Sequence, residues 1–397
     1  MSTVLEPQSR ISPEVKGIAD EVVELRRDFH RHPELMFDLP YTTGKVAAYL
    51  KALGLEVKTG LGQSGVVGLL KGGKPGDTVV YRADMDALPL LEETGYPYAS
   101  ETKGVMHACG HDFHTAVGLG MAKLLVQEKD RLPGSVAFLF QPAEEGGDGA
   151  GAMIADGVLD WLKPKTCFAM HINNDEPVGK IGARVGGVFA GSNEFTIKLK
   201  SKGGHGASPH QAPDLIVIAS HIVIALQTVV SRSVDPRESA VVTVGLLHAG
   251  TKSNILPTEA LLEGTVRTFD KELTLQIAKR IETLARAIAG AHDAGIEYHF
   301  EMNYPPTINA PEPTALVREV AGEVVGPSNV TDYWTTGSED MSRFLDLVPG
   351  CYYVVGAGQA DPEATFAHHS GRFNPDERCL PIAVEMGVRV VRKALGA

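Results

Sequence analysis

The chain has 397 residues, 43% of them hydrophobic and 22% charged, which is typical of a folded globular protein and excludes a disordered or fibrous one. Its 37 Lys and Arg residues face 49 Asp and Glu residues, and the formal net charge of −12 argues against nucleic acid or an anionic membrane as the main partner. At about 150 residues per domain, the length predicts two or three domains.

The expected compartment follows from cysteine usage and from the N-terminus. Four cysteines are too few for a dense disulfide framework. No apolar run reaches the roughly 18 residues that a membrane span needs, and the charged segment 1–31 lacks the apolar stretch of a signal peptide. We expect a cytoplasmic protein without a membrane partner.

The first half of the chain alternates helical and strand patterns. Apolar residues at helical spacing predict helices over 13–31, 41–53 and 112–128. Short apolar runs bounded by turn residues predict strands over 55–58, 66–70, 78–81, 135–140 and 166–170. Buried strands that alternate with helices are typical of an α/β sheet with helices on its faces.

A second, smaller unit is predicted within residues 191–303. Its elements follow the order β-α-β-β-α-β of a ferredoxin-like module, over 194–200, 213–230, 240–247, 260–268, 272–291 and 296–302. A proline-rich stretch then leads back to a helix, an apolar strand and a last helix, over 314–325, 351–355 and 381–393. We therefore expect the small domain to be inserted into a larger one made of residues 1–190 and 304–397.

Polar residues follow three of the predicted strands at their carboxyl ends. The segments 82–86 and 141–147 carry acidic groups, and His171 follows the strand over 166–170. In open α/β sheets ligands bind at this edge, so these side chains are candidates for one site. Arg82 and Asp84 fit a structural ion pair equally well.

The segment 107–114 holds one cysteine and three histidines. A thiolate at Cys109 and an imidazole at His111 suit a borderline-soft cation such as Zn²⁺. Histidines spaced by four and three residues also occur on solvated helix faces, but the nearby pair Glu144 and Glu145 favours a metal site. One carboxylate of such a pair can bind a cation while the other takes a proton from water.

Together these motifs resemble the M20 metallopeptidase family, in particular its amidohydrolase branch with hippurate hydrolases, aminoacylases and auxin-conjugate hydrolases. The resemblance extends from about residue 20 to residue 395, in one order. The matching segments are 32–34 (HPE), 82–89 (RADMDALP), 107–116 (HACGHDFHTA), 141–147 (QPAEEGG), 170–171 (MH), 203–210 (GGHGASPH), 254–257 (NILP), 264–267 (GTVR) and 337–340 (GSED).

The resemblance implies a phosphorylase/hydrolase-like three-layer catalytic domain, an inserted α+β dimerisation domain and a homodimer or tetramer. It also implies two divalent metal ions per subunit, zinc first, with manganese, cobalt or nickel as alternatives. Glu144 would be the general base, and Asp86 would orient a ligand. The implied metal ligands are Cys109, His111, Glu145, His171 and His369.

In the inserted domain, the resemblance gives His205 the role of stabilising the oxyanion, from the partner subunit. Asn254, Arg267 and His210 are candidates for binding the substrate, because Arg offers a bidentate fork to a carboxylate. Arg267 could instead be an ordinary surface charge of a strand.

Three positions bear on how closely the chain follows this family. Peptidase relatives have a histidine ligand at the position of Asp84, whereas the amidohydrolase branch has Asp there. This chain therefore agrees with the amidohydrolase branch. Gly371 replaces a usual proline, which leaves open whether His368 or His369 is the last ligand. Gly206 stands where relatives often have Ala.

The expected reaction is hydrolysis of an N-acyl L-amino acid, with an acetyl, benzoyl or similar group, to a carboxylic acid and a free amino acid. A dipeptidase or carboxypeptidase with the same metal chemistry is the alternative. A non-catalytic binder of acyl-amino acids is disfavoured because every catalytic position is filled.

Overall fold

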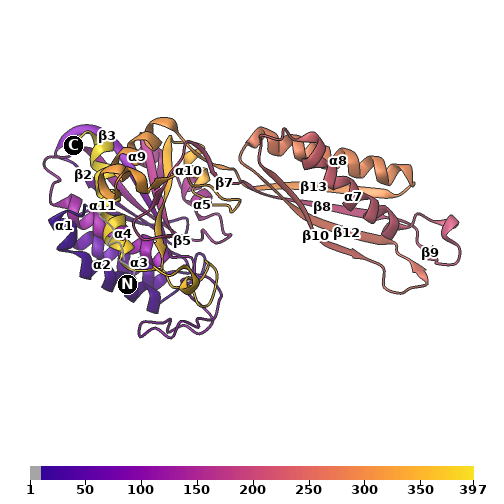
Figure 1. Ribbon diagram of the computed structural model, residues 1–397, viewed down its shortest axis with the longest axis horizontal. Coiled ribbons are helices and arrows are strands. Elements are labelled where there is room, and N and C mark those ends of the chain that lie inside the picture. Colours follow the sequence, from indigo (N-terminus) through magenta and orange to yellow (C-terminus); the bar gives the residue numbers. More distant parts are fainter. Residues whose placement is uncertain (1–9) are drawn as a thin grey trace. The chain divides into compact units, whose positions relative to one another are not determined.

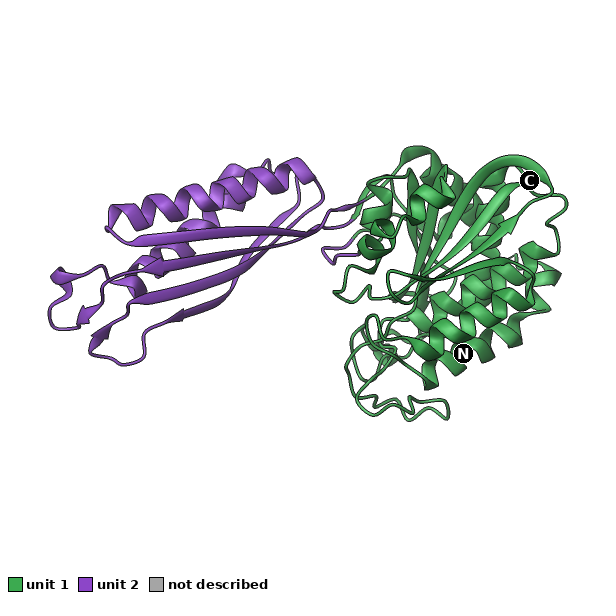
Figure 2. Cartoon of the chain, turned by 180° about the vertical axis from the view of Figure 1, so that it is seen from behind, with its two compact units in different colours: residues 1–188, 308–334, 340–397 green, residues 189–307, 335–339 purple. Residues whose placement is uncertain are grey.

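The computed structural model describes residues 10–397, and the chain divides into two units (Figures 1 and 2). Unit 2 contains residues 189–307 and 335–339, and unit 1 contains the rest. The sequence predicts that residues 335–339 belong to the larger domain. In the structure this segment joins unit 2, because the Ala190 amide donates to the Gly337 carbonyl at 2.9 Å and Phe189 pairs with Thr335.

Unit 1 is built on an eight-stranded mixed sheet with the strand order β1-β2-β4-β3-β5-β16-β6-β15. The strands are β1 (Glu56–Leu61), β2 (Gly65–Lys71), β3 (Lys74–Asp84), β4 (Pro133–Gln141), β5 (Thr166–Pro177), β6 (Ile181–Gly182), β15 (Val330–Thr331) and β16 (Gly350–Gly358). The helices are α1 (Pro13–Lys16), α2 (Ala19–Arg31), α3 (Pro40–Ala52), α4 (His111–Val126), α5 (Gly149–Ala155), α6 (Val158–Leu162), α9 (Pro311–Val325), α10 (Ser342–Leu345) and α11 (Cys379–Leu395).

Both faces of this sheet are covered. Val79 and Tyr81 of β3 pack into the core that α2, α3, α4, α9 and α11 share, and Val80 between them is also fully buried. The short helices α5 and α10 lie on the other side of the sheet (Figure 1). Successive side chains of a strand point to opposite faces, and here both faces are buried, which explains the continuous apolar runs of these strands. The sheet with helices on both faces forms the predicted three layers.

The central strands run parallel, which determines where the polar strand ends meet. β3 pairs in parallel with β4 and β5, and β5 pairs in parallel with β16. Asp84 at the end of β3 lies opposite Gln141 at the end of β4. The acidic groups at the ends of β3 and β4 therefore lie at one edge of the sheet. His171, which the sequence predicts to follow its strand, instead lies within β5, because this strand continues to Pro177.

Unit 2 has the β-α-β-β-α-β order that the sequence predicts. Its antiparallel sheet has the order β10-β12-β8-β13, with α7 and α8 packed together over one face (Figure 1). The elements are β8 (Ser192–Lys200), α7 (Leu215–Ser233), β10 (Ala240–Ala249), β12 (Glu259–Thr268), α8 (Lys271–Ala291) and β13 (Gly295–Tyr304). The smaller pairs are β9 (Gly204–His205) with β11 (Ile255–Leu256), and β7 (Gly186–Phe189) with β14 (Thr307–Asn309).

Helix α7 is more apolar than expected, because the sequence predicts no apolar run long enough to span a membrane. It has 19 residues and a mean hydropathy of 1.8, enough by length and composition alone to cross a membrane. Only 33% of its apolar window is buried inside the protein. One face, including Leu215, Ile222 and Leu226, packs on the sheet of unit 2, so the apolar composition serves this core on that side.

A buried ion pair ties α2 to α4. The Arg26 guanidinium lies 2.9 Å from Asp112, and both side chains are almost fully buried. Arg26 also contacts Glu377, which pairs with the more exposed Arg27 at 2.6 Å. The two neighbouring arginines therefore share one partner and differ in burial.

We predict that Arg26→Met destabilises unit 1 by about 3–5 kcal/mol, because it removes the arginine from the buried Asp112 carboxylate and leaves His30 as the remaining partner. The matched variant Arg27→Met should cost about 0–1 kcal/mol, since its pair is partly exposed. Thermal unfolding followed by circular dichroism measures both variants. Equal melting temperatures would contradict the assignment.

Candidate metal centre

The turn before α4 brings Cys109 and His111 to the sheet edge. Gly110 between them has φ +100°, and a Cβ at this position would lie 2.5 Å from the Ile172 side chain. Only glycine combines this backbone conformation with so close a neighbour. The turn therefore places the thiol and the imidazole beside the middle of β5, at Ile172.

One nitrogen of the His111 ring is available as a ligand. Nδ1 lies 2.8 Å from the carbonyl oxygen of Asp86, which can only accept, so Nδ1 carries the proton. In the neutral ring Nε2 then carries the lone pair, and it is buried without a hydrogen-bond partner. It lies 3.9 Å from carboxylate oxygens of both Glu144 and Glu145.

Cys109 and His171 form a second pair of ligand atoms. The Cys109 sulfur lies 3.3 Å from Nε2 of His171. Nδ1 of His171 donates to the Ile172 carbonyl at 2.6 Å, so the lone pair of this ring is on the nitrogen that faces the sulfur.

The structure distinguishes His369 from His368. His369 Nε2 lies 3.4 Å from Glu145 Oε1, an oxygen that makes no hydrogen bond. His368 is held differently, since its Nε2 accepts the Asn174 amide at 3.2 Å and its ring packs edge to face on His171 with centroids 5.3 Å apart. The main chain fixes this choice, because the His369 amide donates to the Ala108 carbonyl at 2.8 Å and His369 has φ +61°.

These atoms suit divalent ions. Two ligand atoms bound to one tetrahedral ion are about 3.3–3.8 Å apart, close to the separations found here. His111 and Glu145 each have a buried atom that makes no hydrogen bond, and such atoms fit a cation as their partner. Possible ligand atoms lie within 4.8 Å of one another in five groups. Three of them contain the predicted ligands together: Cys109, His111 and His171; Cys109, Glu145 and His369; and His111, Glu144 and Glu145. The other two are Asp84, His111 and His114, and Glu144, Glu339 and Asp340.

The electrostatics of the site call for positive charge. Burial opposes the charge on His111, but Asp84, Asp86 and Glu145 outweigh it and raise the pKa of the ring to about 10. Burial and then the carboxylates of Glu145 and Glu144 raise the pKa of the Cys109 thiol. A divalent cation supplies the charge that protons otherwise provide, and it converts the thiol to a thiolate.

Asp86 holds the Glu144–Glu145 turn as well as His111. Its two carboxylate oxygens accept the Glu144 amide at 3.0 Å and the Glu145 amide at 3.1 Å. The turn begins at Ala143, which has φ +53°. Burial raises the pKa of Asp86, against the lowering effect of His111. One carboxylate thus fixes the backbone of both predicted acidic residues.

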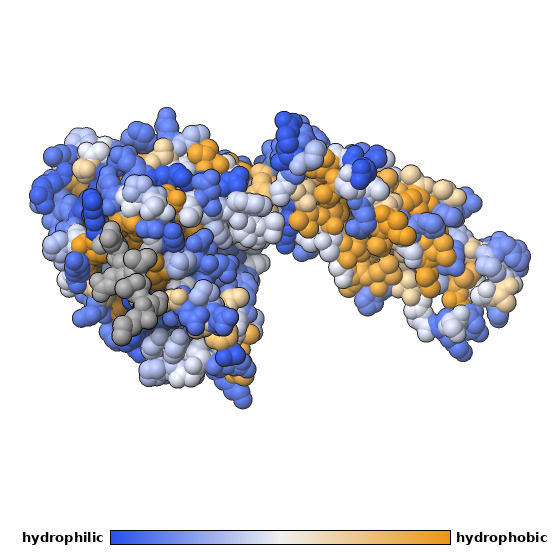
Figure 3. Space-filling model, viewed as in Figure 1, coloured by the Kyte–Doolittle hydropathy of each residue, from blue (hydrophilic) through white to orange (hydrophobic). Residues whose placement is uncertain are grey.

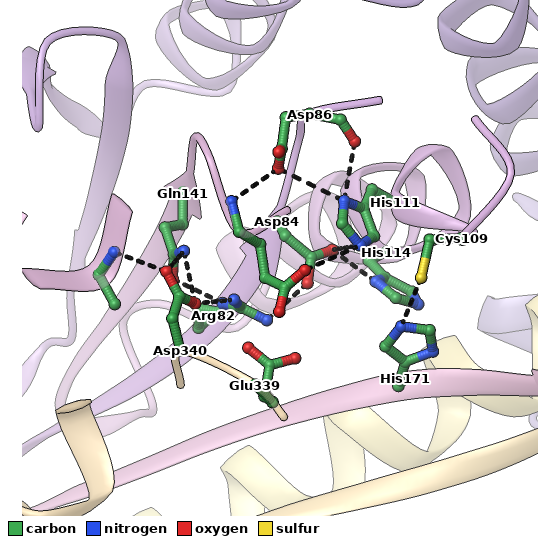
Figure 4. Close-up of polar contacts among 12 residues, drawn as sticks. Arg82, Asp84, Asp86, Cys109, His111, His114, Gln141, His171, Glu339 and Asp340 are labelled. Atoms are coloured by element: carbon green, nitrogen blue, oxygen red, sulfur yellow. Dashed lines mark hydrogen bonds and ion pairs between the residues drawn. The ribbon is translucent and has the colours of Figure 1, made fainter. Parts of the chain in front are cut away.

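A buried network lies beneath these groups (Figure 4). Arg82 donates to Asp84 at 2.5 Å, to Gln141 at 2.8 Å and to Asp340 at 2.8 Å. Asp340 also accepts from Gln141 and from the Ala150 amide. The sequence allows either a structural ion pair or a site role for Arg82 and Asp84, and the structure contains the ion pair. The roles of Gln141 and Asp340 are not predicted from the sequence, although both belong to matching motifs.

The other predicted site residues belong to unit 2. His205 in β9 pairs with Ile255 of β11, and the Gly206 amide donates to the Asn254 carbonyl at 2.9 Å, so His205 and Asn254 lie in neighbouring segments. His210 is exposed in the 3-10 turn Pro209–Gln211. Arg267 is half-buried in β12, where burial lowers its pKa.

The sequence of the chain matches a known protein family. Residues 80–393 match the model of peptidase family M20/M25/M40. The chain belongs to this family. Its membership agrees with the expected fold class, a mixed α/β catalytic domain with an inserted domain, and makes the chain a hydrolase.

Similar proteins are named for different activities. The N-acetyldiaminopimelate deacetylase of Bacillus cytotoxicus is 39% identical over 366 residues, 91% of this chain and 95% of that protein. Thermostable carboxypeptidase 1 of Saccharolobus solfataricus is 38% identical over 377 residues, 94% of this chain and 95% of that protein.

A solved structure supports a two-metal centre. The crystal structure of the YXEP protein of Bacillus subtilis, described as a dinuclear metal binding peptidase, is similar with a TM-score of 0.85 and 34% sequence identity. The match covers 96% of this chain and 99% of that one. Together with the ligand groups described above, it supports two divalent ions per chain.

We predict that His369→Gln lowers the affinity for Co²⁺ about tenfold or more, because it removes a ligand atom beside Glu145. His368→Gln should bind Co²⁺ nearly as wild type does, since glutamine can also accept the Asn174 amide. Competition with a chromogenic chelator measures both affinities. A greater loss in His368→Gln would reverse the assignment.

Proposed function

We propose that the protein hydrolyses N-acyl L-amino acids, with an acetyl, benzoyl or similar acyl group, to a carboxylic acid and a free amino acid. The observation that carries the proposal is the placement of Glu144. Its Oε2 lies 3.9 Å from the free Nε2 of His111, and its backbone is tied to Asp86. A carboxylate beside a two-metal centre is suited to accept a proton from water.

The roles of the residues follow from their donors and acceptors. Cys109, His111, Glu145, His171 and His369 would hold two divalent ions, zinc first, which supply Lewis acidity when bound. Glu144 takes a proton from the water that attacks the amide carbonyl carbon. It then passes that proton to the leaving amine nitrogen as the C–N bond breaks, which balances the reaction.

Residues of unit 2 complete the proposed mechanism. His205 would donate to the oxyanion that develops on the carbonyl oxygen, from the partner subunit. Asn254, Arg267 and His210 would bind the free carboxylate of the amino-acid portion. The half-buried Arg267 has a buried Nη1 that makes no hydrogen bond, as a carboxylate-binding group requires.

A carboxypeptidase is the second candidate, because the similar Saccharolobus solfataricus protein carries that name. A panel of N-acetyl and N-benzoyl amino acids, dipeptides with free α-amines and blocked dipeptides separates the two. We expect the acyl-amino acids to have the higher kcat/KM. Preference for peptides would replace the proposal with the peptidase reading.

We predict that Glu144→Gln lowers kcat about 10²–10⁴-fold, because glutamine cannot accept the proton. Its metal content, measured by elemental analysis, should stay at the wild-type value, since all five proposed ligand residues are intact. The exposed variant Glu101→Gln, in a loop of unit 1, serves as the control with unchanged kcat. Turnover by Glu144→Gln at the wild-type rate would refute the assignment of the base.

We also propose that the protein is a cytoplasmic homodimer that associates through unit 2. The side of α7 away from its sheet exposes Ile216, Val217 and Ile224, and the edge strand β10 exposes Val241 and Leu247. Figure 3 shows apolar residues gathered on unit 2. An apolar face beside an unpaired strand edge suits a second copy of the same surface. All four cysteines are free, which fits a reducing compartment.

We predict that Ile224→Arg converts a dimer to a monomer, because Ile224 is 68% exposed in the single chain and would be buried by a partner. Light scattering after size exclusion measures the mass. Leu275→Arg on α8, at 53% exposure, is the control that should leave the dimer intact. A wild-type monomer would exclude this association.

A further inference from the structure

We propose that Asp84 and His114 act as a positioning pair, which fixes the direction of the His171 imidazole through the peptide of Ile172. The inference rests on the proposed metal centre and adds two residues that do not themselves bind metal. It explains the third histidine of the 107–114 segment, for which the proposed reaction has no use.

His114 cannot be a ligand, because both of its ring nitrogens are occupied. Nε2 accepts the Ile172 amide at 3.0 Å, and an amide can only donate. The proton of the neutral ring is therefore on Nδ1, which donates to Asp84 Oδ1 at 2.5 Å. The ring and the carboxylate are both almost fully buried, so water does not compete for these bonds.

The peptide of Ile172 connects this pair to the metal centre. Its amide is held by His114, and its carbonyl accepts Nδ1–H of His171 at 2.6 Å. The same bond that holds the His171 ring leaves Nε2 facing the sulfur of Cys109 at 3.3 Å. The His114 and His171 rings also lie edge to face, with centroids 4.5 Å apart.

Asp84 is fixed on its other side by Arg82. The Arg82 Nη1 donates to Asp84 Oδ2 at 2.5 Å, so one carboxylate oxygen faces a permanent donor and the other faces His114. Donors at both ends define one arrangement. A rotation of His114 or a change of its tautomer would set two donors against each other.

The decisive variant is Asp84→Asn. Its carbonyl oxygen must face Arg82, so its NH₂ group faces Nδ1 of His114. The ring must then accept at Nδ1 and carry its proton on Nε2, where it opposes the Ile172 amide. We expect the affinity for Co²⁺ to fall about 10–100-fold, with a changed cobalt–thiolate absorption band, while the metal-free protein stays folded.

Asp112→Asn is the matched control, because Asp112 is also a buried partner of an arginine, and its Oδ1 makes no hydrogen bond that an NH₂ group would oppose. It should keep the Co²⁺ affinity and spectrum of wild type. A pair of His114 variants tests the link independently of Asp84. Gln can present an oxygen at the position of Nε2 and should retain more affinity than Asn, which is too short to reach Ile172.

Wild-type Co²⁺ affinity and spectrum in Asp84→Asn, or an equal loss in Asp112→Asn, would overturn the proposal. If Asp84→Asn does not fold, the contrast between His114→Gln and His114→Asn decides, and equal affinities of the two reject the pair. Metal binding is measured without substrate. A wild-type protein that binds metal and cleaves no acyl-amino acid would thus refute the proposed reaction and leave this inference standing.

Discussion

The arrangement of the metal centre depends on one buried cation. Arg82 lies fully buried among Asp84, Gln141 and Asp340, and a charge in such a place is tolerated only when it is paired and hydrogen-bonded. Its donors leave in three directions, toward β3, β4 and the chain that returns from unit 2. The guanidinium therefore fixes three segments that the chain order separates widely, and it sets the base on which the ligand residues are placed.

A second consequence is the separation of charges by depth. The carboxylates nearest to Arg82 are neutralised within the protein, and burial of Asp84 is outweighed by His111, His114 and Arg82, which lower its pKa. Glu144 and Glu145 lie on the turn above, where both carboxylates face Nε2 of His111 and Glu145 also faces His369. A divalent ion can replace the positive charge that these imidazoles offer to the two carboxylates.

The sequence predicts much of this architecture because its signals are local. Apolar runs mark the buried strands, and polar residues at their ends identify the site edge. Signals that depend on distant backbone are not predictable in this way. The amide of Asn174 selects between His368 and His369, and Asp340 reaches Arg82 across 258 residues. Gly17 ends α1, so the helix expected over 13–31 becomes two, and α5 is too short to give a periodic signal.

Gly371 stands where the family resemblance predicts a proline, in the turn that follows His369. The structure shows how this turn is held without the proline. A Cβ at this position would lie 2.5 Å from the Leu91 carbonyl oxygen, and the Glu93 amide donates to the Gly371 carbonyl at 2.6 Å. A side chain would push the two loops apart. Together with the bond from His369 to Ala108, this contact fixes the turn from both sides by main-chain hydrogen bonds. The stiffness that proline would supply within the turn is here supplied by the neighbouring loop, and His369 is directed toward Glu145 by that means.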